Sequence, residues 1–341
     1  MTYIIAEMAF SHDGQEILAL EIATAVSNAK ADALSIHITD MPSYMVKHYG
    51  SGPGRVSAGK DTKPIYDYLE EINPSNETWT KVADQVRKDG LDLIIMPNDL
   101  PSLEFSESLN PDAYVLSAAA FVDQPFVSAI ALKKRKIYLR VGGATLGEIA
   151  DTIAALNKAG NTDLVLLFGH QNYPTSIENT DLLFLKCLKE TFGLPVGLAD
   201  HIDAEDELAT IIPLMSLTLG ATVIEKHITH NRNLKGEDHE SALNPDELTN
   251  FVKRVRMAEK AMGSRYASAL ASSGQYRLVS RKRLVAARDL AEGQILTEDD
   301  FMSKRSDEGA CPSEYQNFLG KKMLRNLKAD RGLDFNLVTS T

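Results

Sequence analysis

The sequence is poor in cysteine, in basic residues and in long apolar runs. Its two cysteines, Cys187 and Cys311, share no metal-like spacing, and so few thiols in 341 residues fit a reducing compartment. The 36 lysines and arginines against 47 aspartates and glutamates give a net charge of -11, which argues against nucleic acid or an anionic membrane as a partner. No apolar run approaches the roughly 20 residues that span a bilayer. Because residues 1–7 also lack the basic start of a signal peptide, we expect a cytoplasmic protein.

Eight short apolar runs, most of them alternating with helical patterns, occupy residues 1–263. The runs, read as strands, lie at residues 3–8, 33–38, 91–96, 113–116, 136–141, 163–168, 196–201 and 222–227. Helical patterns lie at residues 17–26, 79–88, 146–158, 181–191, 205–219 and 244–262. This count and length predict an α/β fold of the (β/α)8 TIM-barrel type. A doubly wound open sheet is the alternative, but no glycine-rich dinucleotide turn follows the first strand, so we favour the barrel.

The composition changes after Gly263. Residues 264–282 begin as a small, polar stretch and are interpreted as a linker, and residues 283–341 show short runs separated by turns. This C-terminal part is too short for a second large domain and predicts a compact β-rich module. Within the barrel part, the glycine-rich segment 50–54 is expected to be a loop.

Two histidines close two neighbouring strands. Residues 196–200 run into His201, and residues 222–226 run into His227, with a predicted helix between the two strands. In parallel α/β folds ligands bind beyond the carboxyl ends of the strands, so both imidazoles are expected in one site. Two neutral imidazoles suit Zn, Mn or Fe better than Ca or Mg. The position of the two histidines alone does not distinguish a metal site from the alternative, in which both rings are structural and have satisfied hydrogen bonds.

The order of motifs along nearly the whole chain resembles the sialic acid synthase family. Members of that family condense phosphoenolpyruvate with N-acetylmannosamine or a related amino sugar to make nonulosonic acids. The matching segments are residues 6–8 with 11–14, then 173–175, 197–201, 225–229, 236–239 and 243–245. The tail resembles the family's antifreeze-like (SAF) module at residues 289–293, 304–305 and 319–321. The resemblance therefore implies a TIM barrel followed by a small β-rich SAF domain.

The resemblance also implies roles for single residues. His201 and His227 match ligands of a divalent metal, usually Mn²⁺, for which Mg²⁺, Co²⁺ or Zn²⁺ are alternatives. Glu7 matches a catalytic carboxylate that positions sugar or water, and Asp238 matches an acid that contacts the sugar hydroxyls. Arg305 matches a module arginine that reaches into the barrel of a second subunit, so a domain-swapped homodimer is expected. The remaining substrate-binding positions are Asp200, Tyr173, Gln171 and His12.

Without the resemblance, several of these residues have simpler interpretations. Glu7 alone would be read as half of a salt bridge at the mouth of the barrel. Asp238 and Arg305 alone would be read as solvated surface charges.

The chain departs from the family at the positions that bind phosphoenolpyruvate. Ser35 stands where the family has a lysine that ends its second strand. Val115, Ala118 and Ala120 stand where the family has a second lysine, a serine and a glutamate. Residues 95–98 and 168–171 also differ from the family, and Ala199 replaces a serine. A phosphorylated anion needs cationic and hydroxyl donors, so these losses should abolish ordinary binding of phosphoenolpyruvate unless other groups compensate. The residues assigned to a rebuilt donor site are Ser35, His37, Arg140 and His170.

Three functional hypotheses remain. The first is a nonulosonic-acid synthase that condenses an enolpyruvate-type donor with an N-acylated amino sugar at a metal centre in carbohydrate biosynthesis. The second is a metal-dependent barrel enzyme that uses another donor or an aldol-type reaction. The third is a catalytically silent homologue that binds a sugar or a partner synthase. The metal and sugar positions persist while the donor positions are lost, which favours the hypotheses in that order.

Overall fold

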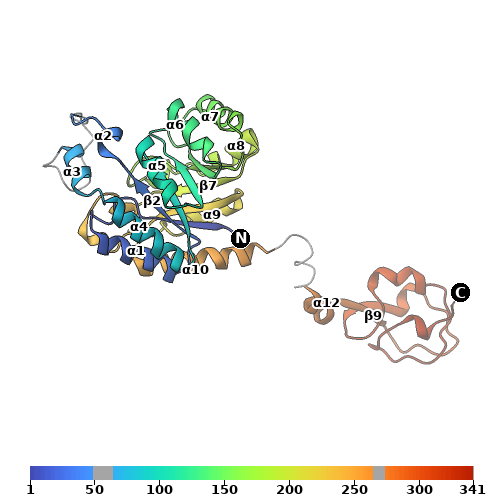
Figure 1. The fold of residues 1–341 in the computed structure, drawn as a ribbon. Coiled ribbons are helices and arrows are strands. Elements are labelled where there is room, and N and C mark those ends of the chain that lie inside the picture. Colours follow the sequence, from blue (N-terminus) through green and yellow to red (C-terminus); the bar gives the residue numbers. More distant parts are fainter. Residues whose placement is uncertain (49–63, 264–272, 341) are drawn as a thin grey trace. The chain divides into compact units, whose positions relative to one another are not determined.

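The computed structural model describes residues 1–48, 64–263 and 273–340 and forms two compact units, Met1–Ala261 and Met262–Thr341 (Figure 1). Each unit is described by itself below. The glycine-rich segment 50–54 and the first residues of the expected linker, 264–272, lie outside the described residues. Among the helices that the structure does describe, none is long and apolar enough to cross a membrane.

The first unit contains a closed barrel of parallel strands in sequence order, so the predicted TIM barrel is confirmed. The barrel strands are β1 (Tyr3–Glu7), β2 (Ala33–Ile38), β3 (Asp92–Pro97), β4 (Ala113–Leu116), β5 (Lys136–Arg140), β6 (Leu164–Phe168), β7 (Val196–Asp200) and β8 (Ala221–His227). All eight predicted strands are present with ends shifted by one residue at most. The ring closes where β8 pairs with β1, which brings His227 opposite Glu7.

Helices cover the outside of the barrel, as α1, α4 and α10 do in Figure 1. They are α1 (Glu16–Ala29), α2 (Met41–Tyr44), α3 (Ile65–Glu71), α4 (Asn76–Lys88), α5 (Leu100–Ser108), α6 (Gln124–Leu132), α7 (Leu146–Lys158), α8 (Leu183–Phe192), α9 (Ile212–Thr218) and α10 (Pro245–Met262). Short 3-10 turns add η1 (Ile177–Asn179), η2 (Arg232–Leu234) and η3 (His239–Ser241). The helix predicted at residues 205–219 is shorter than expected, because Pro213 stands in its first turn.

The sequence prediction lacked the short helices α2, α3, α5 and α6, and the last two share a start signal. Each is only nine residues long and begins with an aspartate cap, Asp99 or Asp123, followed within two residues by a proline. Each cap carboxylate accepts a hydrogen bond from a backbone N–H of the first turn, that of Ser102 or Phe126. Aspartate before an early proline is a helix-start signal, so this pattern could have revealed both helices.

Alternation along the strands divides the barrel into an inside and an outside. The inner layer consists of one or two apolar side chains from each strand, among them Ile5, Ala33, Ile94, Val115, Tyr138, Leu167, Ala199 and Val223. Neighbouring residues such as Ile4, Leu139, Leu198 and Ile224 face the helices in the larger outer core. Because strand side chains alternate, residues two positions beyond an inner residue also point inward. Glu7, His37 and Arg140 are placed inside by this rule.

The C-terminal unit is a small β-rich module with its own core. It contains α12 (Gly274–Ser280), β9 (Lys282–Ala286) antiparallel to β10 (Phe301–Arg305), and the 3-10 turns η4 (Glu298–Asp300), η5 (Pro312–Phe318) and η6 (Phe335–Leu337). Leu284, Phe318 and Leu333 are fully buried in this core. The expected linker 264–282 is corrected at its end, because residues 274–280 form a helix and β9 already begins at Lys282.

The ends of β6 and β7 pack so closely that adding one methyl group at Gly169 should destabilise the fold. A Cβ atom at Gly169 would lie 1.9 Å from the carbonyl oxygen of Ala199, so Gly169→Ala requires the backbone of β6 or β7 to move. We expect Gly169→Ala to lower the free energy of unfolding by about 1–3 kcal/mol, as overpacking in cores does. In contrast, Gly147 lies in α7 with its nearest neighbour 3.9 Å away. Urea unfolding should show Gly147→Ala to be neutral or stabilising, and equal losses for both variants would contradict the packing explanation.

Candidate active site

An ion cluster around Arg140 lies inside the barrel at its carboxyl-terminal end. The Arg140 guanidinium contacts the carboxylates of Glu7 and Glu225, and the second oxygen of Glu7 contacts Nε2 of His37. All four side chains are buried, with at most 9% of any of them exposed. Arg140 ends β5, Glu7 ends β1 and Glu225 lies near the end of β8, so the cluster joins strands on opposite sides of the ring.

Two imidazoles lie beside this cluster. The ring centroids of His201 and His227 are 5.1 Å apart, and both side chains are almost fully buried. Nδ1 of His201 lies 2.6 Å from the carbonyl oxygen of His170, and since a carbonyl only accepts, this nitrogen carries the proton. Nε2 of His201 therefore presents a lone pair, and the described protein atoms offer it no hydrogen-bond partner. Burial lowers the pKa of His201 to about 3 and also lowers the pKa of His227, so both rings are neutral.

Neutral imidazoles with a free ring nitrogen are the form that binds metal ions. The carbonyl of His170 supplies the second contact that such ligands usually have, because it holds the tautomer and the ring orientation of His201. Nδ1 of His227 is also buried without a partner among the described residues. Those residues contain no cluster of three or more His, Cys, Asp or Glu side chains suited to a metal. The chain thus fits a two-histidine site in which water or substrate supplies the other ligands.

A cavity of about 520 Å³ borders the ion cluster at His37 and Arg140, and neither His201 nor His227 is among the described residues that line it. Its wall includes His37, Arg140, Gln171, Tyr173 and Asp238. The Tyr173 ring lies over the histidines, with its centroid 4.4 Å from that of His201, and its hydroxyl donates to Oε1 of Gln171 at 3.0 Å. The Tyr173–Pro174 peptide is cis. An aromatic face, an amide and a carboxyl around buried imidazoles can hold a polyhydroxylated substrate by stacking and hydrogen bonds.

Asp238 is the carboxyl group in this wall with a strongly perturbed acidity. It is partly buried at a left-handed backbone position before η3, with φ 62°. Burial, and then the neighbouring charge of Glu237, raises the pKa of Asp238 to about 7. A carboxyl with this pKa can both give and take a proton near neutral pH.

Comparison with known proteins shows the family of this chain. The family model described as the NeuB family matches residues 22–267. This chain belongs to the NeuB family. The SAF domain model matches residues 281–339, so the C-terminal unit is a SAF domain and the resemblance to sialic acid synthases is confirmed.

Several NeuB-family relatives are similar over nearly their whole length. Pseudaminic acid synthase of Campylobacter jejuni is 30% identical over 327 residues, which cover 96% of this chain and 93% of that protein. N,N'-diacetyllegionaminic acid synthase of Legionella pneumophila is 28% identical, with 96% and 92% covered. A solved structure is also similar, the crystal structure of an N-acetylneuraminic acid (sialic acid) synthetase from Leptospira borgpetersenii in complex with citrate. The two superpose with a TM-score of 0.70 at 22% sequence identity, and the match covers 81% of this chain and 91% of that one. This last likeness shows the fold.

Several expected site residues of this NeuB-family chain do come together. Glu7, His37 and Arg140 form the ion cluster, His201 and His227 lie beside it, and Tyr173, Gln171 and Asp238 share the cavity wall with His37 and Arg140. Arg140 therefore points into the barrel and is no outward surface charge. Glu7 is fully buried and does not line the cavity, and its two oxygens contact His37 and Arg140. Ser35 is fully buried inside the barrel, and its hydroxyl has no partner among the described residues.

Other expected site residues lie elsewhere. Asp200 contacts Nζ of Lys226 in a fully buried pair on the outer side of the strands, because its position alternates with inward-facing Ala199 and His201. The ring of His12 is buried edge-on against Trp79, with centroids 5.3 Å apart, and Nδ1 accepts from the N–H of Gly14. Their geometry gives no support to the expected substrate contacts of Asp200 and His12.

The structure corrects the role of His170 and leaves that of Arg305 untested. The His170 side chain is exposed and bonds Asp181 at 3.2 Å, so only its backbone carbonyl takes part in the site. Arg305 is exposed on β10 of the SAF unit, where its guanidinium lies 3.4 Å from the carbonyl oxygen of Val279. Its expected reach into a barrel stays a prediction.

Sequence reasoning assigned no role to Glu225 or Lys226, although both lie in the matched motif 225–229. The period of two that places His227 inside also places Glu225 inside and Lys226 outside. This alternation was the signal that could have found Glu225 as a member of the cluster.

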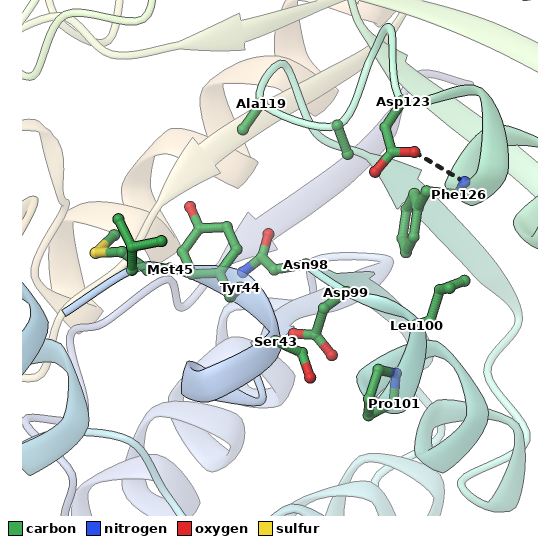
Figure 2. Close-up of a pocket in the computed structure, with 12 residues that line it drawn as sticks. Ser43, Tyr44, Met45, Asn98, Asp99, Leu100, Pro101, Ala119, Asp123 and Phe126 are labelled. Atoms are coloured by element: carbon green, nitrogen blue, oxygen red, sulfur yellow. Dashed lines mark hydrogen bonds between the residues drawn. The ribbon is translucent and has the colours of Figure 1, made fainter. Parts of the chain in front are cut away.

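A second cavity, of about 740 Å³, adjoins the first and shares Tyr44, Met45, Asn98 and Ala119 with it. Figure 2 shows Tyr44 and Asn98 on one side of it and the aspartate cap of α6, Asp123, with Phe126 on the other. No lysine, arginine or histidine is among the described residues that line it. This cavity therefore offers a phosphate no cationic side chain in the part of the chain that the structure describes.

The buried Asp200–Lys226 pair predicts a stability effect. Lys226→Met leaves the Asp200 carboxylate buried without its partner, so we expect the free energy of unfolding to fall by about 3–5 kcal/mol. The double variant Lys226→Met/Asp200→Leu removes both charges and should recover most of this loss. Urea denaturation of the three proteins measures the effect. A double variant as unstable as Lys226→Met would show that the lost charge pairing is not the cause.

The raised pKa of Asp238 predicts a pH-dependent stability. The folded-state pKa of about 7 lies above the ordinary value of 3.8, so folded Asp238 keeps a proton that the unfolded chain has lost between these pH values. Since the folded state then binds more protons, the contribution of Asp238 to stability falls as the pH rises from about 4 to 7. Asp238→Asn should remove this fall, whereas Asp246→Asn, at an exposed aspartate of α10, should keep it. Urea midpoints at pH 5 and pH 8 decide between these outcomes.

Proposed function

We propose that this chain is a nonulosonic-acid-synthase-like enzyme of carbohydrate biosynthesis. It joins an enolpyruvate-type donor to the aldehyde carbon of an N-acylated amino sugar by a new carbon–carbon bond. The observation that carries the proposal is the pair of buried, neutral imidazoles with a free ring nitrogen. Both rings pack against Tyr173, which together with Asp238 lines a cavity of about 520 Å³. The named functions of the pseudaminic and legionaminic acid synthases support the same reaction class.

His201 and His227 would hold a divalent ion, with Mn²⁺ as the first choice and Mg²⁺, Co²⁺ or Zn²⁺ as alternatives. When bound, such an ion supplies Lewis acidity toward a carbonyl oxygen. Tyr173 gives the sugar an apolar face and, with Gln171, hydrogen-bonding groups. Asp238 meets the sugar hydroxyls and holds or releases a proton at its carboxyl oxygen. Glu7 acts through its contacts, because it fixes the directions of His37 and Arg140 in the cavity wall.

A second copy of the chain is part of this proposal. Arg305 is exposed, and its hydrogen bonds to Val279 and Ser280 are long, at 3.4 Å each. The side chain can thus leave these contacts at little cost, as the proposed role in the partner barrel of a domain-swapped dimer requires.

Metal analysis tests the proposal against the silent-homologue hypothesis. We expect wild-type protein dialysed against Mn²⁺ to keep about one ion per chain and His201→Ala to lose it, because the site has only two protein ligands. His170→Ala is the matched control, since this change removes an exposed ring and keeps the carbonyl that orients His201. Binding of N-acylated hexosamines, measured by saturation-transfer NMR, should require the bound ion.

Two outcomes would overturn the proposal. Unchanged metal content in His201→Ala would remove the ligand assignment. Metal-loaded protein that binds no sugar of a broad N-acylhexosamine panel would remove the acceptor assignment.

A further inference from the structure

The segment that carries Asp238 follows β8 and continues into η3. Asp238 lines the cavity of about 520 Å³ and has a left-handed backbone, with φ 62°. This conformation is uncommon for residues other than glycine, although aspartate tolerates it better than most. It persists where the surrounding structure holds it. The direction of the Asp238 carboxyl therefore depends on the contacts of the residues that follow it.

Ser241 links the backbone of Asp238 to the end of β7. The Ser241 side chain is fully buried, and its hydroxyl donates to the carbonyl oxygen of His201 at 2.8 Å. The backbone N–H of Ser241 donates to the carbonyl oxygen of Asp238 at 3.2 Å. Two hydrogen bonds of one residue thus connect the carboxyl of the cavity wall with a histidine of the candidate metal site.

The carbonyl oxygen of His201 holds a second loop of the same wall. It also accepts the N–H of Thr175 at 2.8 Å. Thr175 follows Tyr173 by two residues, and Tyr173 lines the same cavity. A carbonyl oxygen has two lone pairs, so it can accept both donors. The loops that supply Tyr173 and Asp238 to the cavity wall therefore meet at one backbone oxygen.

Contacts with β8 hold the Asp238 segment from the other side. Nε2 of His239, whose ring is fully buried, lies 3.2 Å from the hydroxyl of Thr229. The N–H of Leu243 donates to the carbonyl of His227 at 2.9 Å, and the N–H of Thr229 donates to the carbonyl of Leu243 at 3.0 Å. Residues 238–243 therefore bridge the ends of β7 and β8, where both imidazoles lie.

The contacts on the β7 side differ in how a substitution affects them. The N–H of Ala204 donates to the carbonyl of Glu240 at 2.7 Å, and this backbone bond does not depend on a side chain. The bond from Ser241 to His201 depends on one hydroxyl. When that hydroxyl is removed, the His201 carbonyl keeps its bond to Thr175, so no buried acceptor is left without a partner. Ser241→Ala should thus loosen the segment without unfolding the protein.

We propose, resting on the function proposed above, that Ser241 is a positioning residue of the sugar site. Its hydroxyl holds the Asp238 carboxyl in one place relative to the two imidazoles and to Tyr173, so that an N-acylated amino sugar meets a wall that is already arranged. Groups held in their binding positions avoid the cost of being ordered when the ligand binds. Ser241 itself is fully buried and is not among the described residues that line the cavity, so it acts through Asp238.

Two dissociation constants separate this role from a purely structural one. We would measure Mn²⁺ binding by isothermal titration calorimetry on full-length wild type and Ser241→Ala. Saturation-transfer NMR would measure binding of N-acetylmannosamine and the other N-acylhexosamines of the panel to the Mn²⁺-loaded proteins. Since one buried neutral hydrogen bond is lost, the sugar dissociation constant should rise about five- to tenfold in Ser241→Ala. The Mn²⁺ dissociation constant should change little, because Nδ1 of His201 keeps its bond to the carbonyl of His170.

Matched variants exclude an effect of lost stability. Ser106 is likewise fully buried, and its hydroxyl donates to the carbonyl oxygen of Ser102 within α5 at 2.6 Å. Ser106→Ala removes a bond of the same kind from a residue outside the described cavity wall, and it should leave both dissociation constants unchanged. Ser241→Thr keeps the hydroxyl and should bring sugar binding back to within about threefold of wild type.

Three outcomes overturn the inference. Wild-type sugar affinity in Ser241→Ala would show that the hydroxyl holds nothing that the sugar needs. Equal losses of Mn²⁺ and sugar affinity in this variant would place its effect on the histidines and not on the wall. An equal loss of sugar affinity in Ser106→Ala would assign the effect to stability.

Failure of this inference differs from failure of the proposed function. Wild-type protein that binds no N-acylhexosamine of the panel removes the acceptor assignment and this inference with it. Sugar binding without bound Mn²⁺ removes the ligand assignment, and the sugar dissociation constants still decide the role of Ser241. Sugar binding that is the same in wild type and Ser241→Ala overturns this inference alone.

Discussion

The contact of Arg140 with Glu7 and Glu225 is the interaction on which the rest of the site depends. It lies inside the barrel, where a charge without a partner is costly, so the three groups specify one another's positions. Since they come from β5, β1 and β8, the cluster ties the two ends of the sequence-ordered ring together. It also orients His37, because the second oxygen of Glu7 contacts Nε2 of His37.

Side chains alternate between the inside and the outside of the barrel along neighbouring strands, so adjacent residues have different contacts. On β7 and β8, Asp200 and Lys226 point outward and bond each other, whereas the residues that follow them, His201 and His227, point inward. The outward pair can fix the relative position of two strand ends, which in turn sets the spacing of the imidazoles. The carbonyl of His170 adds a third support from the end of β6. A two-ligand metal site on loops would lack this rigidity.

The carboxyl-terminal end of the barrel has two differently built sides. One side holds His201, His227 and Tyr173, which pack against one another. The other side presents the hydroxyl of Ser35 and the apolar Val115. A barrel separates these sides onto different strands, so one can change while the other is kept.

The sequence by itself determined the barrel, because eight apolar runs alternating with helical patterns leave few other folds, and it determined the strand-end histidines by their position. Through the family resemblance it also gave the expectation, which stays a prediction, that Ser35 and Val115 stand in the place of lysines. Only the tertiary structure decided which charges meet, since Arg140 lies 133 residues from Glu7 and 85 from Glu225. It likewise showed Asp200 turned toward Lys226 and His12 buried against Trp79. The order of motifs gives only which residues are close along the chain. Burial and ion pairing depend on distances across the barrel, and a local sequence pattern does not contain those distances.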